Sequence, residues 1–178
     1  MCSSDLPSVP VHTKRRRQPK KLTRPYTVFK APVVKTPLEG TDEFIRQVVK
    51  RAGGSLWNNG SFVIRDIRTK PGQISNHARG LAVDFSYRKM NDKGIVEGRK
   101  TAMPFVQKLL RNADKLGIEL VIDYQLNRSW KCDRGTWIKG KWSGGSWFHI
   151  EISPDMANNA NLVKQAFSDV FKDMPKTV

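Results

Sequence analysis

Cysteine is scarce in this chain, and long apolar runs are missing from it. The two cysteines, Cys2 and Cys132, offer neither a disulfide framework nor a cysteine-rich metal site. No stretch approaches the roughly 18 apolar residues that a membrane span requires. The first residues, MCSSDLPSVPVH, lack the apolar core of a secretory signal, and the basic run follows them instead of preceding them. If the protein acts outside a membrane, we expect another factor to carry it there.

Acidic residues are few, with 16 Asp and Glu against 32 Lys and Arg, which gives a formal net charge of +16. Nine of the basic residues fall within the first 40 positions, where only Asp5 and Glu39 oppose them. This excess favours a polyanionic partner. Charge alone leaves nucleic acid, an acidic membrane surface and an anionic cell-wall polymer open.

Residues 1–40 also contain six of the ten prolines and few large apolar side chains. Such a segment buries too little surface to offset its ordering entropy, so we predict a mostly disordered, partly polyproline-like arm. Within it, residues 28–34 are a candidate strand, and KRRRQPKK at 14–21 is either a nucleic-acid or localisation patch or a solvated tail. Residues 41–178 are long enough for one domain with its own core.

The spacing of apolar residues predicts the elements of that domain. Helical spacing indicates helices over 41–52, 101–117 and 162–171, the first with Thr41 as N-cap and the second with Pro104 in its first turn. Residues 125–145 are rich in Gly, Trp and Lys, and their tryptophans form either a binding lip or cross-strand pairs in a hairpin. Alternation predicts strands over 61–67, 81–87, 118–124 and 147–153. This mixture predicts an α+β domain, with helices packed on a small, mostly antiparallel sheet.

Histidine is scarce as well, and the positions of its three copies are informative. His12 lies in the arm, whereas His77 precedes the second predicted strand and His149 lies in the last one. Asp84 is on the polar face of the second strand, and His149 shares the polar face of the last strand with Glu151. If these strands pair, His77, Asp84 and His149 converge. Two imidazoles and one carboxylate are the ligand set of a catalytic zinc site that keeps one position for water.

The stretch 75–85, SNHARGLAVDF, resembles the S-x-H-x-x-G-x-A-x-D motif of zinc peptidases that cut peptidoglycan peptides. These enzymes form the D-Ala-D-Ala carboxypeptidase (VanY-type) superfamily, and the similarity is greatest to its extensin-like and phage-encoded branches. Those branches carry an R-x-x-R element shortly upstream, as in Arg65 to Arg68 here, and a last strand with H-x-E or H-x-H, as in His149 to Glu151 here. The resemblance covers about residues 41–155 and leaves out the arm.

The resemblance implies a zinc ion, Zn2+, bound by His77, Asp84 and His149. It also implies that Ser75 braces the ligand loop and that Gly80 lets the chain turn beneath the metal.

Substrate contacts are implied in the same way. Arg65 or Arg68 would approach a carbonyl or carboxylate of the substrate, because a guanidinium stabilises negative charge on oxygen. The alternative for either arginine is a surface ion pair with Asp66 or another carboxylate. Ser75, Ser146 and Trp147 are further candidate substrate contacts.

The chain departs from this family at the general base. The family usually has Glu or Asp three residues before the last histidine, where it takes a proton from the metal-bound water. That position is Ser146 here, and a hydroxyl does not hold a proton as a carboxylate does. Glu151 is the first candidate replacement, although its position more often supports the ligands in the family. Asp123 and then Asp133 follow, and for each the alternative is a surface or structural carboxylate.

The leading prediction is therefore a zinc-dependent peptidase that acts on peptidoglycan stem peptides, as an endopeptidase or a carboxypeptidase. We expect a phage lysin, held in the host cytoplasm before release, or a virion component, acting at the cell wall with its basic arm on anionic envelope polymers. One alternative is a catalytically impaired wall-binding or structural virion protein that retains the metal fold. Another is a nucleic-acid-binding protein that uses the arm and the Trp-rich segment, although no recognised nucleic-acid motif is present.

Overall fold

A single antiparallel sheet forms the centre of the protein in the computed structural model, which describes residues 23–87, 94–142 and 144–172. Within these ranges the sheet has six strands in the order β1-β4-β8-β5-β6-β7. All neighbouring strands are antiparallel. The strands are β1 (Trp57–Gly60), β4 (Ala82–Ser86), β5 (Ile118–Asp123), β6 (Arg128–Lys131), β7 (Trp137–Lys139) and β8 (Trp147–Ile152).

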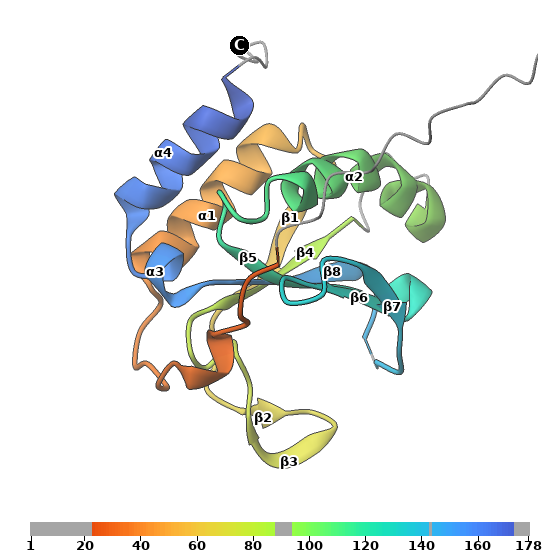
Figure 1. The fold of residues 1–178 in the computed structure, drawn as a ribbon. Coiled ribbons are helices and arrows are strands. Elements are labelled where there is room, and N and C mark those ends of the chain that lie inside the picture. The colour runs from red at the N-terminus through yellow and green to blue at the C-terminus, as the bar shows by residue number, and fades with distance from the viewer. Residues whose placement is uncertain (1–22, 88–93, 143, 173–178) are drawn as a thin grey trace, which may run out of the picture.

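The two faces of the sheet differ in what covers them (Figure 1). Three helices lie on one side: α1 (Glu39–Arg51), α2 (Gly94–Arg111) and α4 (Ala160–Phe171), with the short α3 (Pro154–Ala157) between β8 and α4. On the other side, β2 (Asp66–Ile67) and β3 (Lys70–Ile74) form a separate two-stranded ribbon. This arrangement confirms the predicted α+β class with a mostly antiparallel sheet.

The hydrophobic core lies between the sheet and the helices. Phe148 and Ile150 of β8 are fully buried there, together with Phe44 of α1 and Phe167 of α4, whose rings meet edge to face at 5.4 Å. Each such side chain contributes about 1.5–3 kcal/mol on burial. Because side chains alternate along a strand, fixing Phe148 and Ile150 on the helix side turns His149 to the opposite face.

Helix α2 begins seven residues before the predicted start of the 101–117 helix. Pro104 therefore lies inside the helix instead of in its first turn. Arg99 helps to hold this additional N-terminal part, because its Nε lies 3.0 Å from Asp123 Oδ1 of β5. This ion pair joins residues distant in sequence, so apolar spacing within the segment gave no sign of it.

Two other local predictions were wrong. Residues 61–67 do not form a strand along their length: β1 ends at Gly60, and only β2 falls within the predicted range. Thr41 is not the N-cap of α1, which has Leu38 at that position. The Thr41 hydroxyl is buried and donates instead to the carbonyl of Gly80 at 2.5 Å, which ties α1 to the loop before β4.

The predicted boundary at residue 40 between arm and domain was also wrong. Val28 lies in a short 3-10 helix (Val28–Lys30), with no exposed surface, and belongs to the core. The carboxylate of Glu119 in β5 accepts hydrogen bonds from the backbone N–H groups of Thr27 and Val28. These hydrogen bonds to the buried Glu119 hold the segment against the domain, which its few apolar side chains would not do by themselves. Residues 14–21 lie outside the described ranges.

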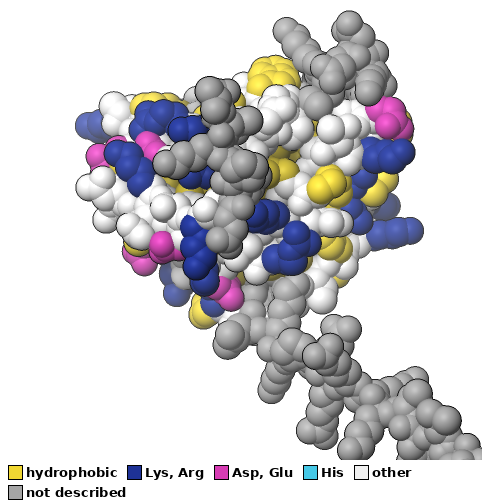
Figure 2. All heavy atoms as spheres, turned by 90° about the horizontal axis from the view of Figure 1, so that it is seen from above, with side chains coloured by type: hydrophobic (Ala, Val, Ile, Leu, Met, Phe, Trp, Pro, Cys, Tyr) yellow, Lys and Arg dark blue, Asp and Glu magenta, His cyan; other side chains and the backbone are white. Residues whose placement is uncertain are grey.

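The helix-covered side of the molecule is rich in basic side chains. Figure 2, which views this side, shows Lys and Arg spread over it with fewer Asp and Glu between them. Exposed examples on α1 and α2 are Arg46, Lys50, Lys100 and Arg111. None of the helices within the described ranges has an apolar stretch long enough for a membrane crossing.

Candidate metal centre

Strand pairing places Asp84 and His149 side by side. The two residues are direct partners in the antiparallel β4–β8 ladder, so their side chains leave the same face of the sheet. This is the face opposite the helices, because their neighbours Phe85 and Phe148 are buried in the core. The strand pairing on which the predicted convergence of His77, Asp84 and His149 depends is thus present.

His77 reaches the same place from the loop between β3 and β4. The loop closes on itself through a hydrogen bond from the backbone N–H of Gly80 to the carbonyl of His77, at 3.0 Å. Gly80 has φ +70°, and a Cβ on it would lie 2.9 Å from Leu38 Cγ. A glycine is therefore favoured here by both conformation and space, which agrees with the turn that the resemblance implies at Gly80. Ser75 braces the loop as well, since its Oγ accepts from the His77 backbone N–H at 3.3 Å.

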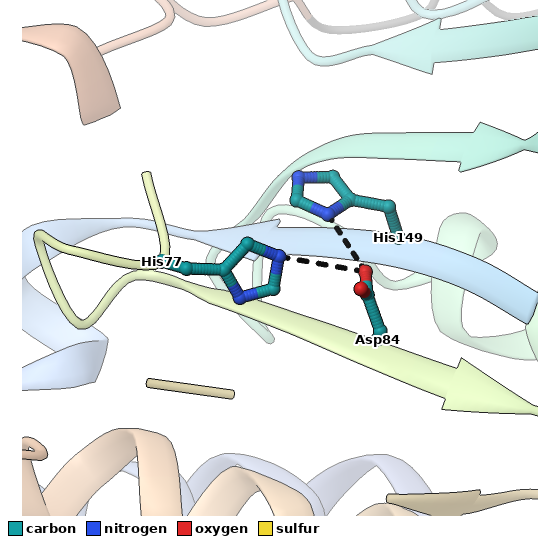
Figure 3. Close-up of side chains that lie close together, drawn as sticks. All are labelled: His77, Asp84 and His149. Atoms are coloured by element: carbon teal, nitrogen blue, oxygen red, sulfur yellow. Dashed lines mark hydrogen bonds and ion pairs between the residues drawn. The ribbon is translucent and has the colours of Figure 1, made fainter. Parts of the chain in front are cut away.

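Three potential ligand atoms converge at this point (Figure 3). Asp84 Oδ1 lies 2.9 Å from His149 Nδ1 and 3.5 Å from His77 Nε2. Ligand atoms of all three residues lie within 4.8 Å of one another. Both histidines are buried and Asp84 is half-buried. The structure therefore contains a group able to hold a metal ion.

The outer ring nitrogens of both histidines have oxygen partners. His77 Nδ1 lies 2.8 Å from the carbonyl oxygen of Ser61, to which it can donate. His149 Nε2 lies 3.0 Å from Glu151 Oε1. Metal-binding histidines commonly donate the outer N–H to a carboxylate or carbonyl, which fixes the tautomer and leaves the inner nitrogen free to bind. Both rings are arranged in this way.

Glu151 supports a ligand instead of facing the reacting position. Its Oε1 interacts with His149 and accepts from Asn76 Nδ2 at 2.7 Å, and its Oε2 accepts from the Tyr26 hydroxyl at 2.5 Å. The carboxylate is buried, and both of its oxygens are engaged. Its first-ranked role as general base is therefore corrected to the supporting role that the sequence left as the alternative.

Asp123 is also removed from the candidate bases. It pairs with Phe148 in the β5–β8 ladder, so it points to the helix side of the sheet, away from His149. There it is fully buried and forms ion pairs with Arg99 and Arg128. Asp123 is a structural carboxylate.

Asp133 and Ser146 do not place a base at the centre either. Asp133 forms an ion pair with Lys131 at 2.9 Å and does not line the cavity described below. Ser146 is buried and also lies outside the cavity lining, and its carbonyl oxygen accepts from the Ser86 hydroxyl at 3.0 Å. The structure therefore does not bring Ser146 to the cavity wall with the other candidate substrate contacts. Among the described residues, Asp84 and Glu151 are the only carboxylates in the cavity wall.

The charges within the centre are strongly coupled. Burial alone raises the pKa of Asp84, but hydrogen bonds from His149 and His77 outweigh it and hold that pKa well below its usual range. Burial lowers the pKa of His149, yet hydrogen bonds to Asp84 and Glu151 raise it to about 10. In the metal-free protein, His149 is therefore protonated, and its positive charge lies where a metal cation would bind.

The centre opens into a cavity of about 1100 Å³ whose two sides differ chemically. One side is cationic and comes from the β2–β3 ribbon and the residue before it, with Arg65, Arg68 and Lys70. Arg65 Nη1 donates to the backbone carbonyl of Asp66 at 3.2 Å, whereas the Asp66 carboxylate accepts from the backbone N–H of Gly72. The predicted alternative of an Arg65–Asp66 ion pair is not formed, and both arginines line the cavity.

The other side of the cavity is aromatic. Tyr124 and Trp147 meet edge to face at 5.7 Å, and Trp142 also lines the space. Two glycines pack closely against these rings: a Cβ on Gly144 would fall 2.3 Å from the Tyr124 ring, and one on Gly145 would fall 2.2 Å from the Trp147 ring. The rings are therefore held in place by close backbone packing, which only glycine permits.

The cross-strand alternative for the tryptophan-rich segment is confirmed for two of its tryptophans, whereas the binding lip stays a prediction. Trp130 and Trp137 are cross-strand partners in β6 and β7, and they pack in or against the core. Trp142 contributes to the cavity wall. Sequence reasoning predicted Trp147 at this site but missed Tyr26, Asn76 and Tyr124. Asn76 lies within the quoted motif, next to His77, and that proximity was the one available signal.

Comparison of the chain with models of protein families, with curated proteins and with solved structures finds no match. The resemblance to zinc peptidases therefore stays a prediction that depends on the motif residues themselves.

Proposed function

We propose that this protein is a zinc-dependent hydrolase that cleaves peptide bonds in peptidoglycan stem peptides. One observation carries the proposal: two histidines and one aspartate converge at a cavity large enough for a peptide. The outer ring nitrogen of each histidine already has an oxygen partner, so the inner one is left for a metal. The resemblance of residues 75–85 and 149–151 to peptidoglycan peptidases supports the choice of substrate.

The residues present fit a zinc ion. Tetrahedral zinc with bonds of ~2.0–2.1 Å places its ligand atoms ~3.3 Å apart. The observed separations of 2.9 Å and 3.5 Å from Asp84 Oδ1 lie on either side of this value. When bound, zinc would supply a Lewis acid for the scissile carbonyl and would lower the pKa of a coordinated water to about 7.

The cavity walls indicate how the chain's own side chains would bind a stem peptide. Arg65 and Arg68 on the cationic side would pair with its carboxylates. On the aromatic side, burial and then the carboxylates of Asp84 and Glu151 raise the pKa of Tyr124, so its phenol stays neutral. A neutral phenol at this position would donate a hydrogen bond to negative charge that develops on the substrate oxygen.

A second candidate function has a specific observation in its favour. None of the described carboxylates that line the cavity is free to accept a proton, because Asp84 lies between the two histidines and Glu151 is fully engaged. This favours a wall-binding or structural virion protein that retains the metal centre with impaired catalysis. In either case we propose action at the cell wall, as a released lysin or a virion component, with the basic arm on anionic envelope polymers. Nucleic-acid binding stays an untested prediction.

Digestion of purified peptidoglycan, followed by mass analysis of the fragments, tests the proposal. We expect peptide-bond cleavage that a chelator abolishes and added zinc restores. The masses identify the bond and so distinguish endopeptidase from carboxypeptidase. A zinc-loaded protein that binds peptidoglycan without releasing fragments would contradict the enzymatic function and favour the second candidate.

Arg68→Gln should weaken turnover of the same substrate. Loss of one charge-assisted hydrogen bond, at about 1.5–3 kcal/mol, corresponds to a roughly 10- to 100-fold lower kcat/KM. The matched control is Arg111→Gln, which removes the same charge from an exposed position on the helix-covered side. Equal activity of the two variants would exclude Arg68 from substrate binding.

Zinc binding should release close to two protons at pH 8, one from His149 and most of another from the coordinated water, whose pKa zinc lowers to about 7. The pKa of His149 is raised from its ordinary 6.5 to about 10 in the metal-free protein, so the ring is still protonated at this pH and must lose a proton before Nδ1 can bind a metal. Titration calorimetry in buffers of different ionisation enthalpy measures this number. Release of no more than about one proton, which the coordinated water alone would supply, would show that His149 is already neutral.

A further inference from the structure

We infer that the segment 24–31, here called the N-terminal strap, is a working part of the metal centre and that Tyr26 is a positioning residue for the ligand His149. The contacts run from the Tyr26 hydroxyl to Glu151, and from Glu151 to His149. This inference rests on the proposed zinc site, and it assigns a role to a segment that lies outside the motifs resembling the peptidases.

The strap is fixed to the sheet at several points. The Arg24 backbone N–H donates to the carbonyl of Cys132 at 3.3 Å, and the Cys132 thiol lies 3.6 Å from the carbonyl of Pro25. The ammonium group of Lys131 lies 4.1 Å from the centre of the Tyr26 ring. Tyr26 is therefore held over the sheet by the backbone contacts of the two residues before it and by the contact of Lys131 with its ring.

Glu119 anchors the same segment from within the sheet. Its carboxylate is fully buried and accepts from the Thr27 backbone N–H at 2.5 Å, the Thr27 hydroxyl at 2.7 Å and the Val28 N–H at 3.1 Å, with Arg24 Nη1 at 3.0 Å. A buried carboxylate without partners is costly, so the ordered strap and the charged Glu119 stabilise each other. The contacts with Glu119 therefore fix the position of Tyr26 in the folded domain.

The hydroxyl of Tyr26 completes a closed set of hydrogen bonds. It donates to Glu151 Oε2 at 2.5 Å and accepts from Asn76 Nδ2 at 3.1 Å, while the same Asn76 nitrogen lies 2.7 Å from Glu151 Oε1. With both oxygens held, the Glu151 carboxylate cannot turn away from His149 Nε2. Since Asn76 precedes His77, the same set also joins the two ligand-bearing segments.

These contacts predict a specific effect on metal binding. Removing the Tyr26 hydroxyl leaves Glu151 with one restraint fewer, so His149 Nδ1 is aimed less well at the metal. Loss of a group bonded directly to a ligand typically lowers metal affinity 10- to 100-fold. Tyr26 lies one contact further out, so we expect the zinc affinity of Tyr26→Phe to fall by about 10-fold, the lower end of this range, with the fold intact.

The control is Tyr87→Phe. Tyr87 is also a buried tyrosine, but it lies against Phe148 on the helix side, and its hydroxyl has no hydrogen-bond partner within the described residues. Zinc affinity of the full chain is measured by competition with a chromophoric chelator, and the visible spectrum of bound cobalt(II) reports ligand geometry. Only Tyr26→Phe should change both, while urea unfolding of the metal-free forms should show that both variants are folded.

A double-mutant cycle tests the route through Glu151. In a Glu151→Gln background, Tyr26→Phe should cause little further loss of affinity, because Tyr26 acts through that carboxylate. Two results would overturn the inference and leave the proposed function standing. One is a zinc affinity of Tyr26→Phe equal to that of the wild type, and the other is a loss of zinc affinity in Tyr87→Phe equal to that in Tyr26→Phe. A wild-type chain that binds no zinc would overturn the proposed function and the inference with it.

Discussion

Asp84→Asn should lower zinc affinity by more than about 100-fold, because loss of a group bonded to a ligand already costs 10- to 100-fold and Asp84 would itself be a ligand in the proposed site. The substitution preserves the size of the side chain but removes the single negative charge that lies between both imidazoles. Its amide also places a donor or a weak acceptor where the metal needs an anionic oxygen. Metal content after dialysis and competition titration measure the effect.

Asp66→Asn is the matched control for this experiment. Asp66 lies in the β2–β3 ribbon beside the cavity, is exposed, and accepts from the Gly72 N–H at 2.8 Å. The same change in net charge at this position should leave zinc binding intact. If Asp84→Asn retained zinc as well as Asp66→Asn does, the convergence of the three side chains would not be a metal site.

The second large effect concerns stability. Asp123→Asn should lower the free energy of unfolding by about 3–5 kcal/mol, because it leaves Arg99 and Arg128 without their charged partner in a buried environment. Zinc affinity should be unchanged, since Asp123 points to the helix side of the sheet. Urea unfolding and zinc competition measure the two quantities.

Asp133→Asn provides the comparison, because Asp133 was also a candidate base and also forms an ion pair. Its partner Lys131 and Asp133 itself are partly solvent-exposed, so the loss should stay within about 1 kcal/mol. Unchanged stability in Asp123→Asn, together with loss of peptidoglycan cleavage, would place Asp123 in the reaction after all.

The convergence of His77, Asp84 and His149 was predictable because their placement depends on local patterns. Alternation along 147–152 assigns His149 to the polar face, and the same holds for Asp84 in β4, so pairing of the two strands is enough to bring them together. The turn that delivers His77 depends on Gly80, which is visible in the sequence.

The roles of the other carboxylates were not predictable in this way. Strand β5 has apolar residues on both faces, with Leu120 and Ile122 on one and Val121 on the other, so alternation does not show which face Asp123 occupies. Glu151 was assigned to the correct face, but a strand pattern does not reveal that Tyr26 and Asn76 occupy its oxygens.

The strap was missed for a related reason. Its composition is that of a disordered segment, and its ordering depends on Glu119, a buried acceptor more than 90 positions later in the chain. Tyr124 was missed because its place in the cavity wall depends on close packing with Gly144. Contacts of this kind follow from the fold and are not local in sequence.

The most direct test of the metal centre is anomalous diffraction at the zinc edge, from crystals of the full chain grown with zinc. The structure predicts one peak bounded by His77 Nε2, Asp84 Oδ1 and His149 Nδ1, with Glu151 still bonded to His149 Nε2. Absence of a peak at this position, with the three side chains still bonded to one another, would contradict the account.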